Sequence, residues 1–182
     1  NSNTSRFYTD IGLLSTDPDI SSDLIELFNY LSGFSKQKTY QKLLVSPTSL
    51  RKKFIFLINR EIENAKRGEK GEIIAKMNSL VDPEIIQLLY LASQTGVKIH
   101  LIIRGICCLY PQRKNLSENI KVTSIIGNFL EHSRIFWFHN NNNSEVFIGS
   151  ADWMRRNLDR RIEAVTPIAV SYTHLRAHET RI

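Results

Sequence analysis

Residues 129–153 read FLEHSRIFWFHNNNNSEVFIGSADW, and this stretch decides the fold. Its two apolar runs, Ile135–Phe138 and Val146–Ile148, are rich in aromatic and β-branched residues, which favour strands. The polar, Asn-rich tip at 139–144 between them is typical of a turn. Two such runs joined by a short polar tip predict a β-hairpin.

Polar groups suited to phosphate lie at one end of this predicted hairpin. His132 and Arg134 come at the start of the first run, and Gly149-Ser150 follows the second, so a hairpin places them close together. An arginine offers a planar charged fork to phosphate oxygens, and a Gly-Ser turn offers backbone N–H groups. An imidazole gives or takes a proton near neutral pH. This end of the hairpin is therefore a candidate phosphate site.

The rest of the chain alternates between strand-like and helix-like patterns. Apolar runs predict strands at 6–14, 42–45, 72–77, 97–103, 120–126 and 161–168. Helical spacing and capping residues predict helices from Pro18, over 49–65 and over 83–96. Strand–helix alternation followed by a meander predicts an α/β domain with a mixed sheet.

Length, charge and cysteine content set wider limits. The 182 residues suffice for one full domain and part of another. The net charge of +6 suits a polyanionic partner, although many proteins without one are as basic. No apolar run could cross a bilayer, and the first residues are not a signal peptide. The adjacent Cys107 and Cys108 form no disulfide framework, so we expect a cytoplasmic protein, with peripheral membrane association left open.

Five longer blocks of sequence carry a family resemblance. They are SRFYTDIGLLS (5–15), IIAKMNSLVDPEII (73–86), GVKIHLIIRGICCL (96–109), LSENIKVTSIIGNFLEHSRI (116–135) and GSADWMRRNLDRRIEAVTPI (149–168). Together they resemble the C-terminal half of bacterial polyphosphate kinases over residues 1–168. The hairpin resembles one half-site of the phospholipase D superfamily, whose motif is His-x-Lys followed later by Gly, then Ser or Gly, then any residue and Asn. Here Arg134 stands at the Lys position and Asp152 at the Asn position.

The resemblance implies a fold and a domain organisation. The fold would be α/β, a phospholipase D-like domain with a mixed β-sheet flanked by helices, plus the remnant of a preceding similar domain. Residues 1–41 would be that remnant and residues 42–168 the truncated C-terminal domain. Residues 169–182 continue none of the five blocks, so we expect them to be an unrelated tail.

The resemblance also implies an enzyme. It would transfer the terminal phosphate of ATP reversibly to polyphosphate through a phosphohistidine, and the phosphorylated histidine would lie outside this chain. Its partners would be ATP, ADP and inorganic polyphosphate. Mg²⁺ would take part, with ligands outside these residues, and the full-length protein would form a homo-oligomer. On its own, this part would be inactive.

Individual residues inherit roles where they match the family pattern. Tyr8 would contact the nucleotide, Arg104 would bind phosphate, and His132 would be the active-site histidine as well as a phosphate contact. Lys76 and Asn78 are further polar groups at a predicted strand end. Other polyphosphate contacts would come from Arg134, Ser150, Arg155 and Arg156.

Other roles for these side chains stay open from the residues alone. Tyr8 could pack in a core as a strand aromatic. Arg104 ends an apolar strand, where ligands collect in α/β sheets, but a surface ion pair is an equal alternative. Arg155 and Arg156 could pair with nearby carboxylates such as Asp159 on a solvated surface.

Two other classes of function also stay open. A phospholipase D-like phosphodiesterase needs two His-x-Lys half-sites, and this chain shows one diverged site. A non-catalytic polyanion- or nucleic-acid-binding domain needs aromatic residues interleaved with Lys and Arg on an exposed face. Most aromatic residues here lie in apolar runs, so we expect no nucleic-acid partner. A P-loop kinase is excluded, because the sequence lacks G-x-x-x-x-G-K-[ST].

Overall fold

A computed structural model describes residues 6–34 and 39–168 of the chain. The tail expected at 169–182 lies outside the described residues. Within the described ranges, no helix combines the length and the apolar character needed to cross a membrane.

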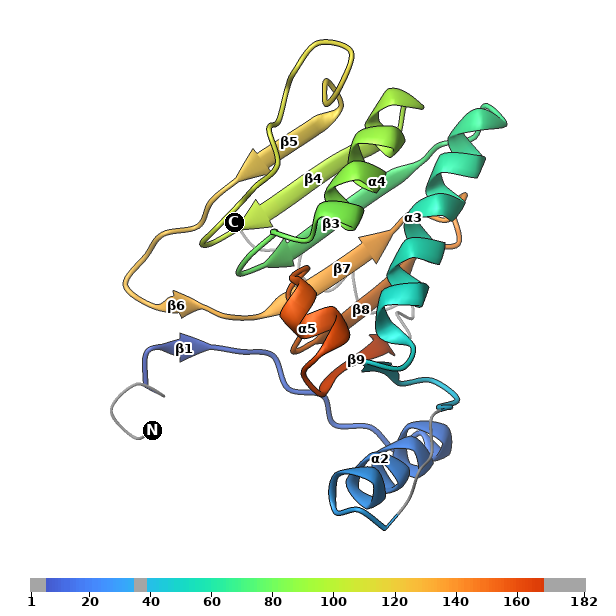
Figure 1. The fold of residues 1–182 in the computed structure, drawn as a ribbon, viewed down its shortest axis with the longest axis vertical. Helices are drawn as coiled ribbons and strands as arrows, with labels where there is room; N and C mark the ends of the chain where they lie inside the picture. The colour runs from blue at the N-terminus through green and yellow to red at the C-terminus, as the bar shows by residue number, and fades with distance from the viewer. Residues whose placement is uncertain (1–5, 35–38, 169–182) are drawn as a thin grey trace, which may run out of the picture.

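A seven-stranded mixed sheet forms the centre of the molecule (Figure 1). Its strands follow the spatial order β2-β9-β8-β7-β3-β4-β5. β3, β4 and β5 run parallel, while the other neighbours pair antiparallel. This confirms the mixed sheet and the hairpin, which is β7 and β8. The strands are β2 (Leu44–Ser46), β3 (Glu72–Met77), β4 (Lys98–Ile103), β5 (Ile120–Thr123), β7 (Arg134–Phe138), β8 (Glu145–Gly149) and β9 (Glu163–Ile168).

Three helices cover one face of this sheet (Figure 1). They are α3 (Leu50–Lys66), α4 (Pro83–Gln94) and α5 (Arg155–Asp159). α4 begins where its capping residues predicted, because the Asp82 carboxylate accepts the Ile85 N–H at 3.1 Å and Pro83 takes the first helical turn. α5 was not expected, since five residues are too few to show a helical period.

Aromatic packing fixes the hairpin against the helices. Phe54 of α3, Phe136 of β7 and Trp153 are fully buried, and their ring centroids lie 4.6–5.6 Å apart. Such pairs add about 0.5–1.5 kcal/mol each to the burial of their apolar area. Because Trp153 follows β8, this cluster also fixes the chain that leaves the hairpin.

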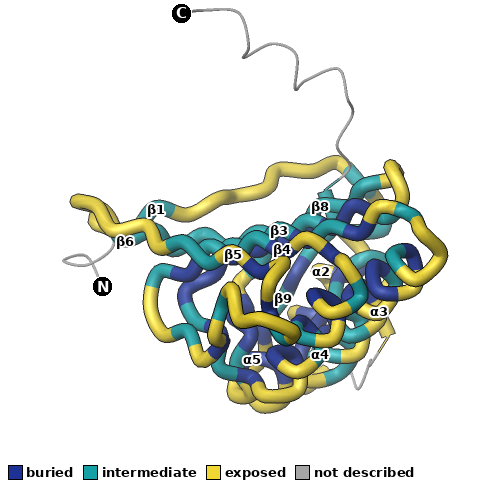
Figure 2. The backbone as a smooth tube through the Cα atoms, turned by 90° about the horizontal axis from the view of Figure 1, so that it is seen from above, coloured by how far each residue is buried: buried dark blue, intermediate teal, exposed yellow. Residues whose placement is uncertain are grey.

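The N-terminal segment lies on the other face of the sheet. β1 (Tyr8–Thr9) pairs in parallel with β6 (Leu130–Glu131), just before the hairpin. The chain then crosses the face that α3–α5 leave open (Figure 2) and enters α2 (Pro18–Leu31). α2 is attached to the domain by its buried Asp23, which accepts three consecutive backbone N–H groups, from residues 41–43, at 2.7–2.8 Å. The domain boundary expected at 41 stays a prediction.

Two expected strands were wrong in extent. The strand at 6–14 is reduced to Tyr8–Thr9, because only β6 is available there as a ladder partner. The strand at 120–126 ends at Thr123, which pairs with Ile102, one residue before β4 ends. A local apolar pattern does not show where the neighbouring strand stops.

Candidate active site

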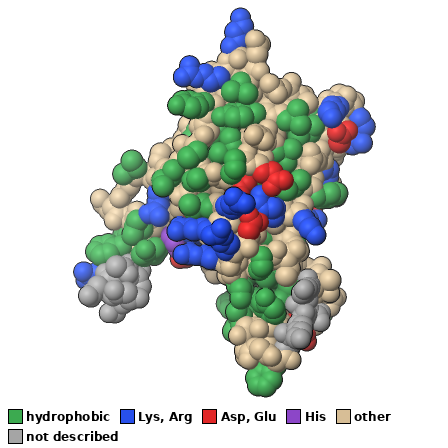
Figure 3. All heavy atoms as spheres, viewed as in Figure 1, with side chains coloured by type: hydrophobic (Ala, Val, Ile, Leu, Met, Phe, Trp, Pro, Cys, Tyr) green, Lys and Arg blue, Asp and Glu red, His purple; other side chains and the backbone are tan. Residues whose placement is uncertain are grey.

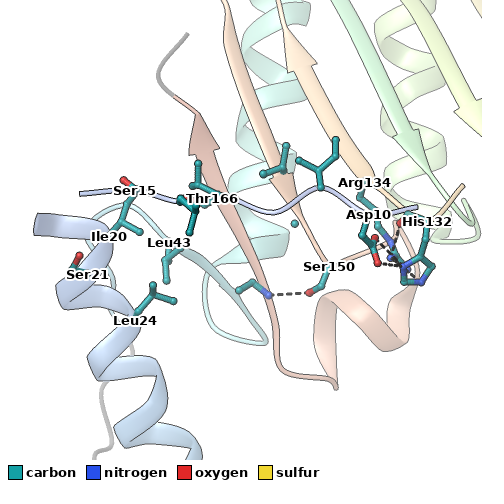
Figure 4. Close-up of a pocket in the computed structure, with 16 residues that line it drawn as sticks. Asp10, Ser15, Ile20, Ser21, Leu24, Leu43, His132, Arg134, Ser150 and Thr166 are labelled. Carbon is teal, nitrogen blue, oxygen red and sulfur yellow. Dashed lines mark hydrogen bonds and ion pairs between the residues drawn. The ribbon is translucent and has the colours of Figure 1, made fainter. Parts of the chain in front are cut away.

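A cavity of about 650 Å³ lies between the N-terminal segment, α2 and the open face of the sheet. Its two ends differ in chemistry (Figure 4). Ile20, Leu24 and Leu43 line the apolar end. His132 and Arg134 lie at the other end, where β7 begins, and Gly149-Ser150 lies nearby where β8 finishes. The hairpin register therefore brings together the groups that the sequence predicted at its end.

His132 is held on three sides at the polar end. Its Nδ1 lies 3.1 Å from both carboxylate oxygens of Asp10. The Tyr8 ring meets the imidazole edge-on, with centroids 4.7 Å apart and planes at 83°. Arg134 Nη1 approaches both ring nitrogens at 3.0 Å and donates to the His132 carbonyl at 2.8 Å. The imidazole is thus oriented by a carboxylate, the arrangement that prepares a histidine for proton transfer.

Asp10 is a site residue that the sequence reasoning missed. It lies 122 positions from His132 along the chain, so no local pattern links the two. A signal was present in the alternation of a strand, which places Tyr8 and Asp10 on the same side. Since Tyr8 was already a candidate site residue, the same alternation makes Asp10, two positions later, a candidate as well.

Lys76, at the end of β3, holds the backbone around His132. Its ammonium lies 2.5 Å from Ser133 Oγ, 3.3 Å from the Ser133 carbonyl and 3.2 Å from the Glu131 carboxylate. These contacts bracket His132 from both neighbours along the chain. Lys76 therefore supports the position of the histidine rather than reaching into the cavity, whose lining does not include it.

Arg104 does not line the cavity, although it belongs to the same hydrogen-bonded group. Its Nε donates to Asn78 Oδ1 at 2.7 Å. Asn78 in turn donates its backbone N–H to Asp152 Oδ1 at 2.9 Å, and Arg134 Nε donates to the same oxygen at 3.1 Å. Arg104 is therefore connected to the polar end of the cavity through two buried side chains.

Gly149 and Ser150 allow β8 and β9 to meet closely at the cavity wall. A Cβ on Gly149 would lie 2.6 Å from Val165 Cγ2, closer than real contacts allow. The Ser150 hydroxyl donates to the Glu163 carboxylate and accepts the Ala164 N–H at 3.2 Å. Ser150 lines the cavity with its hydroxyl engaged by the protein.

Arg155 and Arg156 lie apart from the cavity, on the helix-covered side. Lys and Arg side chains gather over α5 on the face drawn in Figure 3. Arg155 is 78% exposed and lies 4.0 Å from Asp159 one turn later, which is the self-paired arrangement that the sequence left open. Neither arginine is among the cavity's lining residues.

The carboxylates at the polar end are already engaged by neighbouring side chains. Asp10 contacts His132, and Asp152 accepts Arg134. In the part of the chain that the structure describes, no three His, Cys, Asp or Glu residues gather as a metal-ligand group.

Comparison with known proteins identifies the family. A family model described as polyphosphate kinase C-terminal domain 2 matches residues 43–180. The chain belongs to the polyphosphate kinase family. It is 69% identical over 168 residues to a polyphosphate kinase of Prochlorococcus marinus and 56% identical to one of Synechocystis, covering 92% of this chain in both cases. The chain spans about a quarter of the length of these relatives, 24% and 23%.

Solved structures agree with this family and with the expected fold. The polyphosphate kinase of Porphyromonas gingivalis superposes with a TM-score of 0.84 at 45% identity, over 88% of this chain and 25% of that one. NucT of Helicobacter pylori superposes with a TM-score of 0.50 at 18% identity, over 74% of this chain and 88% of that one, which is a likeness of fold alone. The expected α/β fold, a mixed β-sheet flanked by helices, is therefore confirmed.

Proposed function

We propose that this chain is part of an enzyme that transfers the terminal phosphate of ATP reversibly to polyphosphate through a phosphohistidine. The phosphorylated histidine lies in a part of the protein outside residues 1–182. Membership of the polyphosphate kinase family supports the reaction class. The observation that carries the site is the His132 imidazole, fixed by Asp10 and adjoining the Arg134 guanidinium at the polar end of a cavity.

In this proposal His132 is a general acid and base, and it is not the histidine that becomes phosphorylated. As the phosphoryl group leaves its donor, negative charge develops on the oxygen that remains, and an oriented imidazole donates a proton to that oxygen or hydrogen-bonds to it. In the reverse direction, the same nitrogen takes the proton back. Positioned acid–base groups contribute about 10²–10⁴-fold to rate.

The arginines supply fixed positive charge for the phosphate oxygens. Arg134 is next to the imidazole, and Arg104 is tied to the same group of side chains. A guanidinium binds phosphate with two parallel N–H bonds in both the ground state and the transition state. Arg134 and Arg104 therefore bind substrate and stabilise the transferring group together. We assign the nucleotide contact to Tyr8, whose ring meets that of His132.

Mg²⁺ would neutralise charge on the phosphates, and we place its ligands outside this chain, because Asp10 and Asp152 are engaged here. We further propose ATP, ADP and polyphosphate as partners, a cytoplasmic location and a homo-oligomeric full-length enzyme. Residues 1–182 alone are expected to form no polyphosphate, since the nucleophilic histidine is elsewhere.

The test is His132→Ala in a full-length polyphosphate kinase that carries these residues. We expect phosphate transfer from ATP to fall about 10²–10⁴-fold while ATP binding changes little, because the imidazole acts mainly in the transition state. His139→Ala is the matched control, since His139 directly follows the other end of β7, against Trp137. Equal loss in both variants would contradict the role of His132. Phosphodiester hydrolysis without ATP would instead favour the phosphodiesterase alternative.

A further inference from the structure

Two buried residues connect the two arginines of the candidate site. Asn78 and Asp152 are each 5% exposed, and they lie between Arg104 and Arg134. Asn78 donates its backbone N–H to Asp152 Oδ1 at 2.9 Å and its Nδ2 to the same oxygen at 3.4 Å. With the two arginine contacts at the ends, the side chains form one continuous chain of hydrogen bonds, Arg104–Asn78–Asp152–Arg134.

Both arginines join this hydrogen-bond network through their Nε atoms. Arg104 donates Nε to Asn78 at 2.7 Å, and Arg134 donates Nε to Asp152 at 3.1 Å. Among the described residues, no hydrogen bond or ion pair engages Nη1 or Nη2 of Arg104, or Nη2 of Arg134. Arg104 therefore has both terminal nitrogens available for a ligand and Arg134 has Nη2, while the hydrogen bond at Nε limits the freedom of each guanidinium to turn away.

Backbone hydrogen bonds hold the loops that carry these residues. The Gly105 N–H donates to the Asn78 carbonyl at 2.8 Å, joining the ends of β3 and β4. The N–H groups of Val81 and Asp82 donate to the Trp153 carbonyl at 3.0 Å, joining the end of β3 to the chain after β8. The distance between Asn78 and Asp152 is therefore set by the sheet and not by the side chains alone.

Charge explains why the connection is built from one carboxylate and one amide. A buried carboxylate needs compensation, and Asp152 obtains it from Arg134, whose side chain is 11% exposed. The neutral Asn78 fixes the orientation of the Arg104 side chain by accepting its Nε–H, and it adds no second negative charge. Two guanidinium groups and one carboxylate leave a net charge of +1 for an anion to meet.

We propose that Asn78 and Asp152 are positioning residues that couple Arg104 and Arg134 into a two-arginine clamp. The ligand class is a linear phosphate anhydride with neighbouring phosphoryl groups, such as an inorganic triphosphate or a longer chain. This inference rests on the proposed function, because it assigns a geometry to the phosphate-binding arginines of that site. It predicts that Arg104 contributes to binding only while Asn78 orients it.

The experiment is a double-mutant cycle in a full-length polyphosphate kinase that carries these residues. Binding of inorganic tripolyphosphate is measured by calorimetry for Arg104→Ala, Asn78→Ala and the double variant. Asn64→Ala is a matched control, since Asn64 is also buried and its Oδ1 accepts an arginine, Arg67, at 2.6 Å, but it lies on α3 away from the site. A merely structural loss would affect both asparagine variants alike.

We expect Arg104→Ala to weaken binding about tenfold in the parent and in the Asn64→Ala background, the size of one charged hydrogen bond. In the Asn78→Ala background the same change should cost less than about twofold, because Arg104 is no longer held. An undiminished tenfold loss there would overturn the clamp. If Asn78→Ala does not fold, Asn78→Ser replaces it in the cycle.

The parent background separates the two proposals. If Arg104→Ala and Arg134→Ala both leave tripolyphosphate binding unchanged, the phosphate-binding role of the site is wrong, and the clamp falls with it. If both weaken binding and Asn78→Ala behaves like Asn64→Ala, only the clamp is wrong.

Discussion

Arg51 is the residue whose loss should destabilise this domain most through charge. It lies in the first turn of α3 and contacts three carboxylates. Its Nη2 lies 2.6 Å from Asp82 Oδ2, its Nη1 lies 2.6 Å from Glu84 Oε2, and its Nε lies 2.5 Å from Asp159 Oδ1. These carboxylates belong to the start of α4 and the end of α5, so one side chain joins all three helices that cover the sheet.

The size of the effect follows from burial. The Asp82 side chain is 1% exposed, whereas Glu84 and Asp159 are 59% and 35% exposed and keep contact with water. Arg51→Met removes the cation and leaves Asp82 as an uncompensated buried carboxylate, a change that costs about 3–5 kcal/mol. Because two of the three partners are hydrated, we expect about 3 kcal/mol. Urea unfolding of residues 1–182 would shift its midpoint by about 1.5 M for an m-value of about 2 kcal/mol/M.

The pH dependence of stability is a second test of Arg51→Met. Burial alone would raise the pKa of Asp82, but the hydrogen bonds and charge of Arg51, together with the backbone N–H groups of Ile85 and Glu84, outweigh burial and hold the pKa below its ordinary value of 3.8. A depressed carboxyl pKa stabilises the fold above the unfolded pKa, and this stability is lost as the pH falls through the folded pKa. In Arg51→Met the contributions of Arg51 are gone while burial and the backbone N–H groups of Ile85 and Glu84 remain, so the pKa of Asp82 should rise relative to that in the parent. The variant therefore lacks the stability that the parent gains from Asp82 as the pH rises. The gap in stability between the two proteins should widen as the pH rises through the ordinary carboxyl pKa of 3.8.

Lys66→Met is the control for this prediction. Lys66 is 51% exposed and its ion-pair partner Glu63 is 57% exposed, so its loss should change stability by less than about 0.5 kcal/mol. If Arg51→Met stayed within the same limit, or if its deficit did not depend on pH, the account of Asp82 as a buried carboxylate compensated by Arg51 would be refuted.

Two further changes test the walls of the cavity. Gly149→Ala should destabilise the fold by about 1–3 kcal/mol, because the new Cβ meets Val165, whereas Gly12→Ala, with nothing within 4 Å, should not; thermal unfolding compares the two. Asp23→Ala removes the acceptor of three backbone N–H groups, so amide hydrogen exchange in α2 should speed up well before exchange in β3, and unchanged protection of α2 would contradict that attachment.

The central elements were predictable because their signals are local. The strand at 72–77 was predicted with the bounds it has, since six residues alternate between the helix-covered core and the open face. The start of α4 followed from Asp82 and Pro83 alone. The strand expected at 6–14 failed for the opposite reason, since its length depends on the partner that β6 supplies from 121 residues away.

Site residues joined by local structure were also predictable, whereas those joined by long-range packing were not. His132, Arg134 and Gly149-Ser150 came together because one hairpin register places them there. The contacts of Arg104 with Asn78, and of Asn78 with Asp152, join positions 26 and 74 residues apart, and only the packing of three strand ends decides them. Asp10 was missed because it reaches His132 through the pairing of β1 with β6, which joins two segments 122 residues apart along the chain.

The two departures from the phospholipase D half-site motif are the two ends of one interaction. Arg134 stands at the Lys position, and Asp152 stands at the Asn position; Arg134 Nε donates to Asp152 Oδ1 at 3.1 Å. A lysine has a single ammonium, which cannot contact this carboxylate and the His132 carbonyl in the fixed fork that the guanidinium provides. An asparagine at 152 would offer no charge to compensate a buried arginine. The two departures therefore depend on each other, because the buried Arg134 guanidinium requires a compensating carboxylate and Asp152 supplies it.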